Sequence, residues 1–361
     1  MKVKSLETLN FRNLEDGACF FDEGVNVIFG NNAQGKTNLV ECIWLFTGAK
    51  SFRGSRENDY IRFGEEFSAA SMSFFSQGRE QRAQIRFGTE RGVILNGVHQ
   101  RAASGLSGSF CSVVFSPGDV SLISEGPSER RRFLDSTLSQ IKPKYSAALG
   151  EYTRAIAQRA ALLRDVKYHR DLEPLLDVYE SAAASAGAYI VTTRKNYIDF
   201  ISPSASQYYG GISGGKEELT LSYEPTGNET DTREGLELSL KNSRSEDILT
   251  GNTSVGPHRD DMSVLINGAA ARAFGSQGQK RSAALSLKLA EANTLMTFTN
   301  EPPVILLDDV MSELDSGRKK YILNSLGDRQ IFITCCARGD LRGLKAGRTF
   351  KMKAGRLSQM K

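Results

Sequence analysis

The segment GNNAQGKT, at residues 30–37, has the residue types and spacing of a phosphate-binding loop. Gly30 and Gly35 allow backbone N–H groups to turn inward around an anion, where the N-terminus of a following helix adds partial positive charge. Lys36 can reach the β- and γ-phosphates of a nucleoside triphosphate, and the Thr37 hydroxyl can ligate Mg²⁺. The segment therefore predicts a site for ATP and Mg²⁺. The residues expected to line it are Gly30, Asn31, Asn32, Ala33, Gln34, Gly35, Lys36, Thr37 and Asn38.

The sequence on either side of this segment favours that interpretation. The apolar run at 25–29 predicts a buried strand leading in, and Leu39, Val40 and Ile43 predict the apolar face of a helix leading out. A glycine-rich turn with no ligand is the alternative. A strand and a helix at the expected places make that alternative weaker.

An acidic pair ends a second apolar run, VILLDD at 304–309. In a protein with a phosphate-binding loop, an acid at the end of a buried strand holds Mg²⁺, usually through water, and we assign this role to Asp308. Asp309 is placed to orient or deprotonate the attacking water, so Asp309 and Lys36 are the predicted catalytic residues. Because the two motifs lie at opposite ends of the chain, we expect one sheet built from both ends.

A further candidate is FGSQGQKR at 274–281, which precedes a predicted helix. The hydroxyl and backbone N–H groups of such a helix start can bind an anion, helped by the helix dipole. The alternative is a serine that caps the helix and does nothing else. The candidate nucleotide contacts here are Ser276, Gln277, Gly278 and Gln279.

Length and composition set broader limits. With 361 residues, the chain is expected to form two domains, or one with an insertion. No apolar run approaches the roughly 20 residues that span a bilayer, and the N-terminus lacks a signal peptide's apolar core. Five cysteines without C-x-x-C spacing favour reduced thiols in the cytoplasm over a zinc site. The net charge of +4 is compatible with a polyanionic partner without requiring one.

The order of predicted elements locates the insertion. Short strands are expected near 3–9, 71–75, 83–87 and 93–95, and Asn-Gly pairs at 96–97 and 267–268 predict hairpins. Apolar residues then recur at helical spacing over 149–163 and 175–197, which predicts a hairpin of two helices of about 25 residues each.

The segments that flank this helical hairpin are less regular. Residues 203–215, rich in Ser, Gly and Tyr, are expected to form a loop. Arg130, Arg131 and Arg132 form either a solvated helix face or a phosphate contact. The predicted domains are an N-terminal part of an ATPase head at 1–125, a helical arm at 126–255 and a C-terminal part of the head at 256–361.

Taken together, these motifs resemble the ABC-type ATPases. The resemblance identifies 276–279 as the signature motif and the S-x-L-D string at 312–315 as the D-loop. It implies that the signature helix of one protomer closes over the γ-phosphate bound by the other. ATP would thus clamp two copies into a homodimer.

Further strings resemble one family over essentially the whole chain, namely the RecF family of bacterial recombination mediators. They are NFRN at 10–13, KSFR at 50–53, FSP at 115–117, RRFLD at 131–135, GPHRDD at 256–261 and LDDVMSELD at 307–315. The implied fold is α/β, an ABC-type P-loop ATPase head (Rad50-like) with an inserted α-helical arm domain. The implied activity is slow ATP hydrolysis coupled to dimer dissociation.

The resemblance also implies partners. They are DNA, whether single-stranded, gapped or duplex, and the proteins RecR and RecO, with which the family loads RecA. The resemblance further implies roles in DNA repair, DNA replication and the SOS response, and no membrane partner.

The resemblance extends to single residues, with two departures. Arg12 and Arg53 are expected near the nucleotide, although Arg12 has the alternative of a surface turn residue. His258 and Arg259 match the family string without a physical role that we can assign. The Gln that ABC ATPases place before the arm and the switch His after the last core strand are absent. Thr334 stands near the latter place and can hydrogen-bond the γ-phosphate or the lytic water, so slow turnover is expected.

Two other classes of protein compete with this interpretation. The ATPase subunit of a membrane transporter would carry the missing Gln and His. An architectural relative of the chromosome-maintenance proteins would need hundreds of residues of heptads, and the predicted arm is far shorter.

Overall fold

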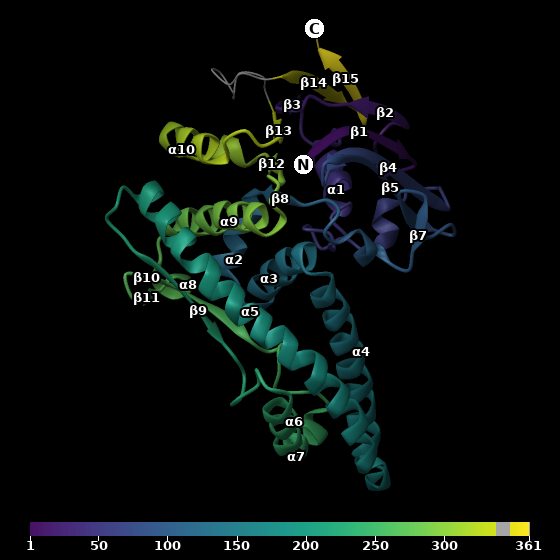
Figure 1. Ribbon diagram of the computed structural model, residues 1–361, viewed down its shortest axis with the longest axis vertical. Helices are drawn as coiled ribbons and strands as arrows, with labels where there is room; N and C mark the ends of the chain where they lie inside the picture. The colour runs from purple at the N-terminus through teal and green to yellow at the C-terminus, as the bar shows by residue number, and fades with distance from the viewer. Residues whose placement is uncertain (337–346, 361) are drawn as a thin grey trace. The chain divides into compact units, whose positions relative to one another are not determined.

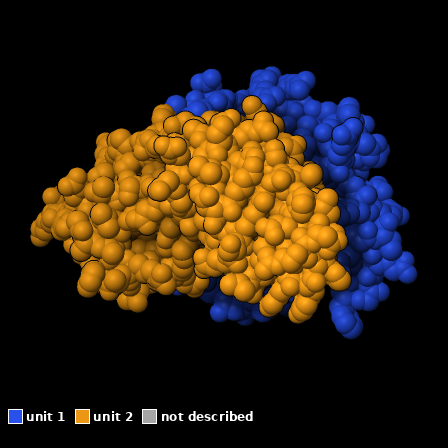
Figure 2. Space-filling view, turned by 90° about the horizontal axis from the view of Figure 1, so that it is seen from below, with its two compact units in different colours: residues 1–120, 139–141, 284–361 blue, residues 121–138, 142–283 orange. Residues whose placement is uncertain are grey.

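Two units with separate sets of internal contacts make up the chain, and Figure 2 colours them. Unit 1 comprises residues 1–120, 139–141 and 284–361, and unit 2 comprises residues 121–138 and 142–283. The structure is a computed structural model that describes residues 1–336 and 347–360. The three domains expected from the sequence stay a prediction.

The core of unit 1 is a six-stranded sheet of order β15-β14-β3-β13-β12-β8. Its strands β14, β3, β13, β12 and β8 are parallel neighbours, and β15 pairs antiparallel with β14. Every residue of β8, β12 and β13 is buried, which is why these strands are continuous apolar runs and not alternating ones. The strands are β3 (Val25–Phe29), β8 (Ser112–Phe115), β12 (Val304–Asp308), β13 (Ile331–Cys335), β14 (Arg348–Lys353) and β15 (Arg356–Met360).

A second six-stranded sheet in unit 1, of order β2-β1-β4-β5-β6-β7, is antiparallel throughout. Asn96 and Gly97 both have positive φ, 51° and 81°, and turn β6 into β7, so the predicted hairpin is confirmed. The strands are β1 (Lys2–Leu9), β2 (Gly17–Phe20), β4 (Phe67–Ser76), β5 (Arg79–Gly88), β6 (Gly92–Leu95) and β7 (Val98–Gln100).

The helices of unit 1 connect these strands. Helix α1 (Lys36–Leu45) follows β3, and α10 (Ser316–Leu326) joins β12 to β13. Helix α9 (Gln277–Thr299) begins in unit 2 and leads into unit 1. The 3₁₀ helices are η1 (Glu57–Tyr60), η2 (Ala103–Leu106), η3 (Pro117–Val120) and η5 (Val310–Glu313). Among the described residues, no helix is long and apolar enough to cross a membrane.

Unit 2 contains the predicted helical hairpin, in which α4 (Pro143–Val166) and α5 (Leu176–Ser213) pack side by side (Figure 1). A three-stranded sheet of order β11-β10-β9 has the second predicted hairpin, at Asn267-Gly268, between β10 and β11. The other elements are α2 (Ser121–Ser124), α3 (Pro127–Ile141), η4 (Arg170–Leu175), β9 (Leu219–Glu224), α6 (Arg233–Asn242), α7 (Arg244–Thr250), β10 (Asp261–Ile266), β11 (Ala269–Ala270) and α8 (Ala271–Phe274).

The prediction of a loop at 203–215 was wrong, because α5 continues through this segment to Ser213 and is 38 residues long. Ile201, Ala205 and Tyr209 recur at helical spacing and are fully buried, so packing outweighs the cost of Pro203 within the helix. The helix ends at Gly214, whose φ of 74° is readily adopted only by glycine.

Neither prediction for the arginine run, a solvated helix face or a phosphate contact, holds for Arg130. Arg130 is buried and binds the Asp261 carboxylate through Nε at 2.7 Å and Nη2 at 2.8 Å, so it is neither solvated nor available to a phosphate. Arg131 donates to the Asp260 carbonyl at 2.8 Å. Arg132 is exposed and pairs with Glu129, as expected of a solvated face.

The structure provides the missing account of His258 and Arg259. His258 Nδ1 lies 2.6 Å from the Tyr152 hydroxyl, and its Nε2 lies 3.1 Å from the Thr253 carbonyl oxygen. Arg259 Nε donates to the same carbonyl at 2.9 Å. Burial lowers the pKa of His258. His258 therefore fastens the segment before β10 to helix α4, and Arg259 closes that segment on itself at Thr253.

Candidate nucleotide site

The phosphate-binding loop at 30–37 follows β3 and needs glycine at two places. A Cβ on Gly30 would lie 2.3 Å from the carbonyl oxygen of Met352 on β14. Gly35 has φ 111°, and a Cβ there would lie 2.9 Å from Asn13 Oδ1. Since larger residues fit neither position, the spacing of the two glycines reflects the packing of the loop.

Helix α1 begins at Lys36 with Gly35 as its N-cap, a residue that has no side chain to bond the first-turn N–H groups. Such an uncapped start is suited to an anion. Lys36 is buried, and its Nζ donates to the Gly30 carbonyl at 2.6 Å and the Asn31 carbonyl at 2.9 Å. Among the described residues, no carboxylate lies within ion-pair distance of this ammonium, so its charge suits a phosphate ligand.

Three neighbouring strands bring Thr37, Asp308 and Thr334 together. Thr334 on β13 is the register partner of Asp308 on β12, and β13 also pairs with β3, which leads to the loop. Thr37 Oγ1 donates to Asp308 Oδ1 at 3.1 Å, and Thr334 Oγ1 donates to the same oxygen at 2.8 Å. A hydroxyl and a carboxylate at the carboxyl ends of parallel strands fit Mg²⁺, which takes its other ligands from water and phosphate.

Burial is the largest influence on the Asp308 carboxyl and raises its pKa. The hydrogen bonds from Thr334 and Thr37 act in the opposite direction, because they favour the charged form, whereas the charge of Asp309 raises the pKa further. Burial thus favours either the neutral carboxyl or a carboxylate paired with a cation.

Asp309 leaves the strand in a left-handed conformation, with φ 54°. Its backbone N–H donates to Thr334 Oγ1 at 2.9 Å, and Ser312 Oγ donates to its carbonyl at 2.7 Å. Asp tolerates this conformation better than most residues. The turn separates the two adjacent carboxylates, one held on β12 and one beyond it, and the role of Asp309 as a base remains a prediction.

Arg12 and Arg53 lie around a buried carboxylate that the sequence analysis overlooked. Arg12 follows β1, and its Nη2 is 2.8 Å from Glu41 Oε2 on α1. The Arg12 side chain is only 16% exposed, so it is not a solvated surface residue. Arg53 Nη1 donates to Asn38 Oδ1 at 2.9 Å, next to Thr37. The available signal was a single acid inside the apolar run LVECIW.

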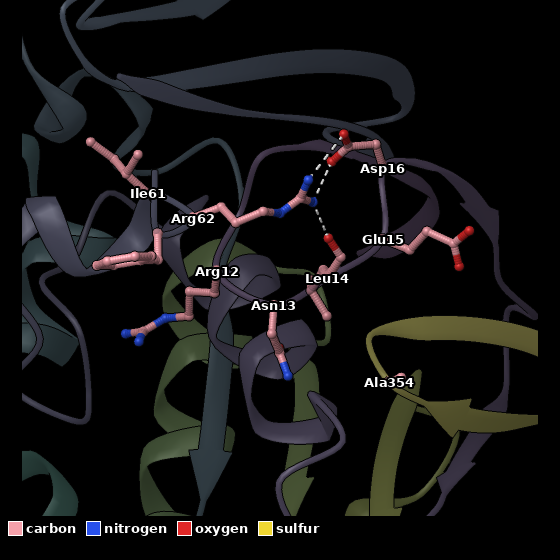
Figure 3. A pocket seen from close by; sticks show the side chains of 9 residues that line it. Arg12, Asn13, Leu14, Glu15, Asp16, Ile61, Arg62 and Ala354 are labelled. Atoms are coloured by element: carbon pink, nitrogen blue, oxygen red, sulfur yellow. Dashed lines mark hydrogen bonds and ion pairs between the residues drawn. The ribbon is translucent and has the colours of Figure 1, made fainter. Parts of the chain in front are cut away.

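A pocket of about 810 Å³ lies next to the loop (Figure 3). Asn13 connects the two, because its Nδ2 lies 3.4 Å from the Ala33 carbonyl and its Oδ1 accepts from Asn38 Nδ2 at 2.7 Å. Arg62 crosses the pocket to Asp16 and the Leu14 carbonyl, as the dashed lines show. The lining residues are Arg12, Asn13, Leu14, Glu15, Asp16, Ile61, Arg62, Phe63 and Ala354.

The turn of the β14–β15 hairpin braces the loop, which sequence reasoning missed. Gly355 N donates to the Gln34 carbonyl at 2.9 Å, and Ala354 N donates to Gln34 Oε1 at 2.6 Å. Gly355 has φ 84°, and a Cβ there would lie 1.8 Å from the Asn13 carbonyl oxygen. An Ala-Gly pair predicts a turn, but nothing in the sequence indicates that this turn reaches residue 34.

The signature segment forms a capping box at the start of α9. Gln279 N donates to Ser276 Oγ at 3.2 Å, and Ser276 N donates to Gln279 Oε1 at 2.8 Å. Gln279 Nε2 also donates to Glu217 Oε1 at 2.6 Å. The capping role of Ser276 is thus observed. The contact of Ser276, Gln277, Gly278 and Gln279 with a nucleotide stays a prediction.

The place expected for the switch His holds a thiol. Cys335 ends β13, and Cys336 Sγ donates to Asn32 Oδ1 of the phosphate-binding loop at 3.1 Å. Thr334 is fully buried, with its hydroxyl shared between Asp308 and Asp309. A direct contact of Thr334 with the γ-phosphate remains a prediction, and it would require the hydroxyl to give up one of these partners.

Comparison with known proteins supports the assignment of this site to an ABC-type ATPase. Residues 2–356 match the RecF/RecN/SMC N-terminal domain family. The chain is 40% identical over 337 residues to the DNA replication and repair protein RecF of Agathobacter rectalis, covering 93% of this chain and 92% of that protein. It is 40% identical over 356 residues to the protein of that name from Caldanaerobacter subterraneus, covering 95% and 96%.

A solved structure of the recombination mediator protein RecF with ATP, in the RecFOR pathway, matches with a TM-score of 0.92 at 38% identity. The match covers 100% of this chain and 98% of that one. The predicted fold, an ABC-type ATPase head with an inserted helical arm, is confirmed, and relatives named as DNA repair proteins do not favour a transporter subunit. The chain belongs to the RecF family of DNA replication and repair proteins.

Proposed function

We propose that this chain is a slow ATPase of recombinational DNA repair that binds ATP with Mg²⁺, dimerises on ATP and binds DNA. The observation that carries the proposal is the arrangement of Lys36, Thr37 and Asp308 at the carboxyl ends of adjacent parallel strands. With RecO and RecR, the dimer helps to load RecA at single-strand gaps or at junctions of single and double strands. It thereby supports replication and SOS induction in the cytoplasm.

Each part of the loop has one task in nucleotide binding. The uncapped N–H groups of α1 and the Lys36 ammonium hold the phosphates, while Thr37 and Asp308 hold the metal. When bound, Mg²⁺ neutralises phosphate charge. The pocket lined by Arg12 and Asn13 provides room for the nucleoside half.

Hydrolysis in this scheme depends on Asp309, which orients or deprotonates the attacking water. Thr334 cannot act as a charged switch, because its side chain does not ionise. Slow turnover follows, since one source of transition-state stabilisation is missing. The consequence of hydrolysis is dissociation of the dimer.

The dimer shares each nucleotide between two chains. The signature segment at 276–279 presents a helix start to the γ-phosphate held by the partner's loop. Support comes from the residues of the segment, none of which is acidic; the capping bonds between Ser276 and Gln279 would have to open before these two N–H groups could reach a phosphate.

DNA retention by the purified protein tests this function. The protein is titrated against single-stranded, duplex and gapped DNA, with and without ATP, at several salt concentrations, because phosphate-driven affinity falls steeply with salt. ATP should increase retention by wild type and not by Lys36→Ala. Lys241→Ala, on an exposed ion pair of α6, is the control and should behave as wild type. Equal retention with and without ATP would overturn the proposal.

Mixing two variants tests whether the site is shared. Ser276→Arg places a bulky cation at the signature segment, and Lys36→Ala removes the phosphate contact, so neither should dimerise alone with a slowly hydrolysed ATP analogue. In the mixture, one composite site combines an intact loop with an intact signature, and light scattering should detect dimer if one site suffices. Normal dimerisation of Ser276→Arg alone would refute a shared site.

A further inference from the structure

A buried carboxylate lies behind the phosphate-binding loop, on the face of α1 that also carries Thr37. Glu41 is one helical turn beyond Thr37 and is 0% exposed. A charged side chain removed from water is retained only where partners compensate for its lost hydration. The partners of Glu41 therefore indicate what the charge is for.

Glu41 joins two segments that are distant in the sequence. Its Oε2 lies 2.8 Å from Arg12 Nη2 and 3.5 Å from Arg53 Nη1. Its Oε1 accepts a hydrogen bond from Ser51 Oγ, which in turn accepts one from the Arg53 backbone N–H at 3.0 Å. One carboxylate thus fixes the turn after β1 and the segment after α1 against the same helix.

Arg12 is held in an unusual conformation by these contacts. It has φ 48°, its guanidinium lies 5.3 Å from the centroid of the Tyr60 ring, and its Nη2 donates to Ser55 Oγ at 2.6 Å. Within the described part of the chain, its buried Nε has no hydrogen-bond partner. Such a strained, non-glycine backbone persists only where the surrounding contacts hold it, and it occurs often at ligand sites.

Arg53 connects the same carboxylate to the metal-binding end of the site. Its Nη1 donates to Asn38, directly after Thr37, and its side chain is 42% exposed. Arg53 therefore reaches the residue that directly follows Thr37, a candidate metal ligand.

Two guanidinium groups so close together repel each other, and the charge of Glu41 lies between them. We propose that Glu41 is a positioning residue, which holds Arg12 and Arg53 at the edge of the phosphate-binding loop so that both act on the bound nucleotide. The role rests on the proposed ATP binding. Glu41 itself touches no ligand in this scheme, because it is fully buried beneath the arginines.

Unit 2 contains a comparable buried carboxylate without a phosphate-binding loop, in a larger network in which Arg159 also pairs with Asp247 and Arg244 with Asp177. Glu180 on α5 is also 0% exposed and also lies between two arginines, with its Oε1 3.0 Å from both Arg159 Nε and Arg244 Nε. Neutralising Glu180 therefore measures what the loss of such a triad does to stability alone.

The experiment compares the affinity for the γ-thio analogue of ATP, with Mg²⁺, and the melting temperature. Glu41→Gln keeps the shape and the acceptor for Ser51 but removes the charge, and should weaken analogue binding roughly tenfold or more. Glu180→Gln should lower the melting temperature with unchanged affinity. Glu41→Asp retains the charge and should keep most of the affinity.

Dependence on the arginines separates positioning from folding. In a chain that already carries Arg12→Ala and Arg53→Ala, adding Glu41→Gln should leave analogue affinity unchanged, since nothing remains to be positioned. A further loss in that background, or equal losses for Glu41→Asp and Glu41→Gln, would overturn the role. Wild type that binds no analogue would refute ATP binding itself, whereas equal binding by wild type and Glu41→Gln would refute only the positioning.

Discussion

Replacing Thr334 by valine should weaken the candidate metal site, because Thr334 supports the metal ligand Asp308. The side chain is fully buried, and its hydroxyl donates to Asp308 at 2.8 Å and accepts from the Asp309 N–H at 2.9 Å. Valine fills the same space with neither bond. The partly buried Asp309 N–H left without a partner costs about 1–3 kcal/mol, and the lost bond to a charged carboxylate about 1.5–3 kcal/mol. We therefore expect the free energy of unfolding to fall by about 2.5–6 kcal/mol.

The effect on Mg²⁺ separates this role from general destabilisation. The Thr334 hydrogen bond lowers the pKa of Asp308, so its removal raises that pKa further above the ordinary value. Protons compete with the cation for the carboxylate, and metal affinity is lost as the pH falls through the pKa. In Thr334→Val, that loss should occur at higher pH than in wild type, with Mg²⁺ affinity roughly 10–100-fold weaker near neutrality.

The assay is a Mg²⁺ titration of ATP-analogue binding at several pH values, with melting temperatures measured in parallel. Thr334→Ser retains the hydroxyl and should recover most of the metal affinity. Thr294→Val removes another buried hydroxyl, which donates to the Ala290 carbonyl at 2.8 Å on α9, and should leave Mg²⁺ binding unchanged. If Thr334→Val melts lower but binds Mg²⁺ as wild type does at every pH, the hydroxyl does not support the metal site.

Three further predictions concern other parts of the chain. Asp309→Asn should slow single-turnover hydrolysis by roughly 10²–10⁴-fold while ATP affinity changes little; hydrolysis lost only in Asp308→Asn would reverse the two roles. Gly355→Ala should lower both melting temperature and ATP affinity, because its Cβ would lie 1.8 Å from the Asn13 carbonyl oxygen; unchanged calorimetric binding would show that the hairpin turn does not support the loop. Because the folded-state pKa of His258 is below its ordinary value, the free energy of unfolding should fall as the pH drops from about 6.5 through the lowered pKa. Denaturant unfolding of His258→Gln should show a smaller decline in this pH window. Identical pH profiles for the variant and wild type would contradict the role of a buried, neutral His258.

Local sequence patterns were sufficient to predict the two strands that lead to the candidate site residues and the two hairpins. The apolar runs before Gly30 and Asp308 form buried parallel strands, and both Asn-Gly pairs form hairpins, because burial and turn geometry act over a few residues. The same reasoning failed at 203–215. Composition suggested a loop there, while helical spacing of Ile201, Ala205 and Tyr209 determined the outcome.

By itself, the sequence determined the phosphate-binding loop, the acidic strand and the family, since each depends on residue types at fixed spacing. Only the tertiary structure decided which charged side chains form ion pairs with one another. Arg130 pairs with Asp261, and Glu41 lies between Arg12 and Arg53. The physical reason is that burial makes each ion pair a matter of three-dimensional neighbours, and parallel strands bring together residues from opposite ends of the chain. The contact of Gly355 with residue 34 has the same origin, because no local pattern encodes which loop a distant turn will support.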